Sequence, residues 1–175
     1  MHRIQSIIVA LCLAYPLGVS AQSPQFGIGF GPGNGLKIPI QWPAYRLRIE
    51  PAFWYSVSTY EQSTPIPSAS TTSDRQFELQ ILQLKPLTGD FGTSRGIKLG
   101  RIWSRSESAT GSYDTRQSAK LLGIIGLEYR LNPRAFVVFE AGAGLNWTES
   151  NSAFAYTSRT ISTLSSSSMS LRLMF

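Results

Sequence analysis

Residues 45–57 read YRLRIEPAFWYSV, and their apolar and polar side chains alternate along the chain. Every second residue, beginning with Tyr45, is apolar or aromatic, whereas Arg46, Arg48 and Glu50 lie between them. Successive side chains of a β-strand point to opposite faces of its sheet. The stretch therefore predicts a strand with one apolar face and one face that carries charges of both signs.

This predicted strand has the length needed to cross a bilayer in a barrel wall. From Tyr45 to Tyr55 it would rise about 33 Å, which a tilt of about 40° reduces to roughly 25 Å of height. The apolar band of a transmembrane barrel has this height, and aromatic side chains border it on both sides. The interface aromatics that we expect are Trp42, Tyr45, Phe53, Tyr55, Tyr129 and Trp147.

Similar alternation recurs along the whole chain. The predicted strands cover residues 25–31, 36–42, 45–59, 75–84, 97–105, 118–130, 135–148 and 166–175. Short turns at 43–44 and 132–134 alternate with long Ser/Thr-rich loops at 60–74, 106–117 and 149–165; segment 85–96 is too long for this rhythm and 32–35 too short. Short turns at one end and long loops at the other are typical of outer-membrane barrels. We therefore predict an all-β fold: an antiparallel up-and-down transmembrane β-barrel of about eight strands.

The N-terminal residues have the pattern of an export signal. Arg3 supplies a positive charge, residues 7–14 are apolar, and small residues precede a cleavage site after Ala21. The apolar stretch is too short to span a bilayer, so an N-terminal anchor fits less well, and Cys12 lacks the context of a lipoprotein. We expect a signal peptide at residues 1–21 and a barrel domain at residues 22–175.

The composition of the predicted mature chain excludes several kinds of function. Cleavage removes Cys12 and His2, the only cysteine and histidine, so no disulfide, thiol or imidazole chemistry would remain. Without Arg3, 15 of the 16 bases stand against 10 acids, and these charges are scattered. We therefore expect no nucleic-acid partner, no metal and no cofactor. Glu140 interrupts the best apolar run, so a membrane-spanning helix is not expected either.

The last strand ends on an aromatic residue. Apolar side chains alternate along it, and the residues concerned are Met169, Leu171, Leu173 and Phe175. In this pattern the chain resembles the bacterial outer-membrane barrels, and most of all the small OmpA- and OmpX-type barrels. The resemblance covers the predicted mature chain as a pattern and not as residue identity. It implies a place in the bacterial outer membrane, contact with lipid and lipopolysaccharide, and recognition of the last strand by the outer-membrane assembly machinery.

A soluble ligand-binding barrel of lipocalin type is the main alternative, since it also has about eight strands. Its apolar face would point inward, so alternation alone does not separate the two architectures. Three features favour the membrane: aromatic residues border the apolar face, the polar face holds long charged side chains, and the chain stops at an aromatic strand end.

Charged residues on the polar faces form the candidate site, a charge network inside the barrel. Its predicted members are Lys37, Arg46, Arg48, Glu50, Glu78, Lys98, Lys120, Glu128, Arg130, Glu140 and Arg172. Because the glutamates are interleaved with bases, ion pairing explains them better than paired-carboxylate catalysis. The seven bases exceed the four glutamates by three, so a pore through this lumen would favour anions.

Three functions are compatible with such a barrel. The first is a non-enzymatic structural or surface-interaction protein with a lumen filled by side chains, in which the Ser/Thr-rich loops could bind an unidentified extracellular partner. The alternative is a narrow, anion-preferring pore. A lipid-modifying outer-membrane enzyme fits least, because the known outer-membrane barrel enzymes resemble one another in relying on a histidine, and the predicted mature chain has none.

Two local predictions depend on strand register. A two-residue turn at 43–44 would place Ile40 opposite Leu47, Ile38 opposite Ile49, and Lys37 opposite Glu50 inside the barrel. In the fifth strand Arg95 and Arg101 share the lipid face with Ile97 and Leu99. Each arginine must therefore reach a membrane interface, or a bulge near Gly100 must shift the register.

Overall fold

The computed structural model describes residues 23–31, 35–62, 68–108, 112–152 and 157–175, so the predicted signal peptide lies outside the described part. The strands are β1 Gln25–Phe30, β2 Leu36–Lys37, β3 Ile40–Trp42, β4 Leu47–Gln62, β5 Ser68–Pro86, β6 Phe91–Ser108, β7 Tyr113–Asn132, β8 Ala135–Asn151 and β9 Thr157–Met174. Among these residues, no helix has the length and apolar character to cross a bilayer.

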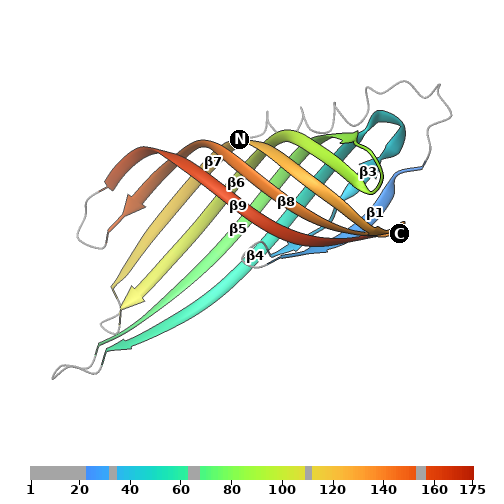
Figure 1. The fold of residues 1–175 in the computed structure, drawn as a ribbon. Coiled ribbons are helices and arrows are strands. Elements are labelled where there is room, and N and C mark those ends of the chain that lie inside the picture. The colour runs from blue at the N-terminus through green and yellow to red at the C-terminus, as the bar shows by residue number, and fades with distance from the viewer. Residues whose placement is uncertain (1–22, 32–34, 63–67, 109–111, 153–156) are drawn as a thin grey trace.

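The strands form one antiparallel sheet that closes into a ring at the end with the short turns (Figure 1). From β4 to β9 each strand pairs with the next along the chain, and β1 closes the ring against β9. This closing pair is short and runs only from Gly27–Met174 to Phe30–Leu171. β2 and β3 are two pieces of one predicted strand, interrupted at Pro39, which has no N–H to donate. The prediction of an up-and-down barrel of about eight strands is confirmed.

The sheet has polar side chains inside and apolar side chains outside. Arg48, Glu50 and Arg172 are buried, whereas Ile125 is 68% and Phe53 54% exposed. A soluble barrel would show the inverse, because apolar side chains leave water when a protein folds in water. The lipocalin alternative is therefore excluded, and the apolar outer face suits the hydrocarbon of a bilayer.

The strands extend well into the stretches predicted as long loops. β5 begins at Ser68, β7 at Tyr113 and β9 at Thr157, so the predicted loops 60–74, 106–117 and 149–165 are largely strand. Ser and Thr are abundant there and leave no continuous apolar face, yet the backbones continue the ladders begun by the more apolar halves. Segment 85–96, which is too long for a short turn, is mostly strand as well. β5 and β6 are joined by a short turn with Gly89 at φ 66°.

The predicted two-residue turn after β3 is wrong. Residues Pro43–Tyr45 form a 3-10 turn, and Arg46 follows in the left-handed region at φ 51°. This longer connection places Ile40 opposite Ile49 and Lys37 opposite Ala52, two residues away from the predicted register. A shift of two residues preserves the faces of a strand, so the predicted inside and outside are kept.

The register of β6 continues without a shift past Gly100, so the bulge considered there is absent from this described strand. Arg95 and Arg101 both point outward. Arg95 donates to Gln83 Oε1 from Nε (3.0 Å) and Nη2 (2.9 Å). Arg101 donates to Gln117 (3.0 Å) and lies 5.2 Å from the centre of the Trp103 ring.

Candidate functional site

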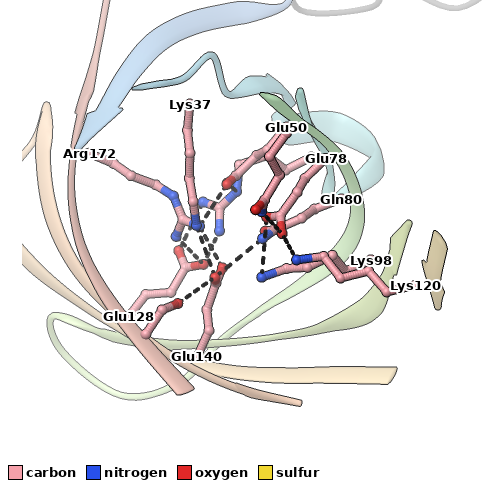
Figure 2. Close-up of polar contacts among 12 residues, drawn as sticks. Lys37, Glu50, Glu78, Gln80, Lys98, Lys120, Glu128, Glu140 and Arg172 are labelled. Carbon is pink, nitrogen blue, oxygen red and sulfur yellow. Dashed lines mark hydrogen bonds and ion pairs between the residues drawn. The ribbon is translucent and has the colours of Figure 1, made fainter. Parts of the chain in front are cut away.

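Buried charges from most of the barrel wall converge in the lumen, as Figure 2 shows. Arg172 projects from β9 and is fully buried. Its Nη2 contacts Glu50 Oε2 of β4 at 2.7 Å and Glu140 Oε1 of β8 at 2.6 Å, and Nη1 lies 3.7 Å from Glu128 Oε1 of β7. One guanidinium therefore joins its own strand to three others.

Two further bases complete this central cluster. Arg48 Nε lies 2.6 Å from Glu50 Oε1, and its two terminal nitrogens both contact the Glu128 carboxylate, with Nη1 at 3.1 Å from Oε2. Lys37 Nζ donates to Glu140 Oε2 at 3.0 Å. Three bases and three carboxylates thus form a neutral set. This balance is what a low-dielectric interior requires, since an uncompensated buried charge is costly.

A second cluster surrounds Glu78 on β5. Its carboxylate contacts Lys120 of β7 and lies 3.6 Å from Lys98 Nζ of β6. Gln80 joins the two clusters: in one amide orientation it donates to Glu140 (3.2 Å) and accepts from Lys98 (3.1 Å). The network therefore crosses the lumen from wall to wall.

Glycines on neighbouring strands make room for these long side chains. A Cβ at Gly100 would lie 2.8 Å from Lys120 Cγ, and one at Gly29 would lie 3.2 Å from Lys37 Cβ. Both distances are closer than ordinary van der Waals contact. The inward glycines are thus part of the site, because a larger residue would displace the bases they face.

Two predicted members do not belong to the buried network. Arg46 is exposed at the turn after β3, and Arg130 is exposed with its Nε 3.6 Å from Asp90 Oδ1. Both lie at the barrel end, where each strand has reached its turn. The buried lumen therefore holds five bases and four glutamates, so the excess is one positive charge and not the predicted three.

Sequence reasoning also missed uncharged members of the site. Gln80 links the two clusters, Gln76 Nε2 donates to Glu78 Oε1 at 2.7 Å, and Ser168 Oγ donates to Glu140 Oε2 at 3.3 Å. The available signal was strand parity, since Gln76, Glu78 and Gln80 alternate along one face. Uncharged polar residues on the lumen face therefore belong to the network as well as the charged ones.

The geometry of the four lumen glutamates suits ion pairing. Each carboxylate contacts at least one base. The described residues include no group of His, Cys, Asp and Glu that could hold a metal ion. The ion pairs join strands that are far apart in the sequence, so the role that the contacts indicate is structural.

The remaining predicted residues lie on the outer surface. Met169, Leu171, Leu173 and Phe175 of the proposed assembly signal are 48%, 41%, 36% and 70% exposed. The predicted interface aromatics Tyr45, Phe53, Tyr55, Tyr129 and Trp147 are also exposed, and Trp42 is half-buried. Tyr55 and Trp147 lie towards one end of the barrel, and Trp42, Tyr45 and Tyr129 towards the other.

No family model and no curated protein matches the chain. Solved structures do. A major outer membrane protein from Thermus thermophilus superposes with a TM-score of 0.51 at 13% identity, over 88% of this chain and 100% of that one. CarO from Acinetobacter baumannii follows with a TM-score of 0.43 at 9% identity, over 89% of this chain and 98% of CarO. The fold is that of the bacterial outer-membrane β-barrel proteins.

Proposed function

We propose that the protein is a non-enzymatic barrel of the bacterial outer membrane, with a closed lumen and a structural or surface-interaction role. The observation that carries this proposal is the ion-pair network around Arg172. Its side chains come from β2, β4, β7, β8 and β9 and are buried, so they occupy the cross-section where a permeation path would run. Barrels of about eight strands are commonly filled by side chains in this way.

The absence of an enzymatic role is part of the proposal. Every lumen glutamate contacts a base, and a histidine is missing from all residues after His2. The common nucleophile–histidine arrangement therefore cannot form in the barrel. Recognition of the last strand by the assembly machinery, contact with lipopolysaccharide, and an extracellular partner of the Ser/Thr-rich end remain proposals of the same kind.

Planar-bilayer recording of the purified full-length mature protein tests the closed lumen. We expect a silent membrane at moderate voltage. Steady, anion-selective channels from pure protein would contradict the proposal and favour a narrow pore instead. As a matched pair, Arg172→Met opens the central cluster, whereas Arg159→Met changes a side chain that is 80% exposed at the rim. Only the first should introduce conductance.

One observation favours the pore as second candidate: the buried lumen keeps one base in excess, in the cluster of Lys98, Lys120 and Glu78. A pore that passes this cluster would select anions because the local field is positive. If channels are recorded, Lys98→Gln with Lys120→Gln should reduce their anion preference. Unchanged selectivity would show that the current takes another route.

A further inference from the structure

A small groove lies on the outer surface of the barrel at the end where the short turns are. Its volume is about 330 Å³, and side chains of Arg46, Gln83, Lys85, Thr93 and Arg95 line it. β5 and β6 form its floor, and the turn after β3 forms one wall. Arg46 lines this groove, and it also lines an adjoining hollow at the same barrel end together with Glu128 and Arg130.

The groove is cationic. Arg46, Lys85 and Arg95 all line it, and none of its lining residues is acidic. Like charges close together repel one another, so this arrangement favours an anion between them. Charge-assisted hydrogen bonds from arginine and lysine are the usual way to bind phosphate.

Local hydrogen bonds hold the side chain of Arg95 and the backbone of Arg46 in place. Arg95 gives two hydrogen bonds to Gln83 Oε1 through Nε and Nη2, which fixes the plane of its guanidinium. Leu84 N donates to Arg46 O at 2.6 Å and thereby joins the turn to β5. Because Arg95 is already oriented, it loses little conformational freedom when an anion binds.

The surroundings of the groove are apolar. Directly towards the middle of the barrel, Ile81 of β5 pairs with Ile97 of β6, and both face outward. On the next strand Ile125 lies opposite Arg95 and is 68% exposed. The surface therefore combines a cationic groove with a neighbouring apolar wall, which complements a molecule that has an anionic head and hydrocarbon tails.

We propose that this groove binds the phosphate headgroup of an anionic phospholipid, with the acyl chains along Ile81, Ile97 and Ile125. The short-turn end of such barrels faces the periplasm, so the lipid belongs to the periplasmic leaflet. The headgroup balances the charge of Arg95, whose outward position between apolar residues is otherwise unfavourable. This lipid site is independent of whether the lumen conducts.

Native mass spectrometry of the full mature protein tests the proposal. The protein is extracted from vesicles that hold equal amounts of phosphatidylglycerol and phosphatidylcholine, and the bound lipid is counted. We expect retention of phosphatidylglycerol, reduced about tenfold in Lys85→Gln/Arg95→Gln because two charge-assisted donors are lost. The control Arg101→Gln/Arg105→Gln removes two outward arginines from the other end of β6 and should retain the lipid.

Several outcomes would overturn the proposal. One is equal retention in the groove variant and the control, and another is equal retention of the two lipids by the wild type. Displacement of phosphatidylglycerol by millimolar inorganic phosphate would indicate a free-anion site, and preferential capture of lipopolysaccharide through the same residues would place the site in the wrong leaflet. If the double variant does not fold, Lys85→Gln alone, which changes an exposed side chain, is used for the comparison.

Discussion

Arg172 makes more ion pairs than any other described base, because its guanidinium contacts carboxylates of three other strands. Replacing it with Met should destabilise the barrel by about 3–5 kcal/mol, since Glu50 and Glu140 each lose a cation while buried. Equilibrium urea unfolding in detergent micelles, followed by tryptophan fluorescence, measures this loss. Arg159→Met should unfold like the wild type, because its ion pair is exposed and 3.7 Å long. Equal losses in both variants would contradict a supporting role of the network.

At the same scale, the sequence predicted the lumen-facing charges except Arg46 and Arg130, which are exposed at the barrel end, but it did not predict which of these charges form pairs. The face on which a side chain lies is a local property, because it follows from the alternation along its strand. Lys37 and Glu50 are accordingly both buried, as expected. Pairing depends on the closed ring. Lys37 contacts Glu140, which is 103 residues away in the sequence, and not Glu50 as predicted. A local sequence pattern cannot predict a contact between residues so far apart in the chain.

At the scale of the element, the turn after β3 sets the register of the first strands. We expect a cysteine pair at Ile40 and Ile49, which lie opposite one another, to form a disulfide on mild oxidation. A pair at Ile40 and Leu47, which a two-residue turn would place opposite, should remain reduced. Mobility on non-reducing gels gives the result, and single-cysteine variants report intermolecular crosslinks. The opposite result would restore the register predicted from sequence.

The last strand tests recognition separately from stability. Phe175 is 70% exposed, and its backbone N–H donates to Phe26 O at 2.7 Å. Phe175→Ala keeps this backbone bond and removes only the ring. It should therefore slow assembly in cells while refolding into detergent proceeds at the wild-type rate. Pulse-chase labelling and refolding kinetics measure the two, with Phe53→Ala as a control for the loss of an exposed ring elsewhere. Normal assembly of Phe175→Ala would remove the reason to assign a signal to this end.

Element lengths were the least predictable part of the fold. β9 begins at Thr157, nine residues before the predicted start at residue 166. The Ser/Thr-rich residues between these positions lack the continuous apolar face by which a strand is recognised in a sequence. Pairing with β8 nevertheless continues to Asn151–Thr157. Extending a ladder that is already in register costs little free energy, so the length of β9 depends on its neighbour β8 and not on its own sequence alone.

At the scale of the whole molecule, closure predicts how the protein behaves in detergent. The half of the barrel that holds the short turns is a ring without free strand edges, so the protein should resist unfolding by SDS unless it is heated. We expect a compact, fast-migrating band before boiling and a slower band after it. The protein should fractionate with outer membranes, and its mass should correspond to a chain that starts at Gln22. A soluble band of unchanged mobility, recovered with the periplasm, would contradict the membrane placement.

The short closing pair between β1 and β9 has a consequence for the order of events in folding. β9 pairs with β8 along most of its length, but among the described residues it pairs with β1 only from Leu171 to Met174. This seam should be the last to close during assembly and the first to open in fluctuations, since local opening starts where few backbone hydrogen bonds must break. In hydrogen–deuterium exchange, amides of β9 before Leu171 should therefore exchange faster than those of β7, which has a partner on each side. Local opening of the barrel would then be concentrated at one seam, where the first and last strands of the chain pair.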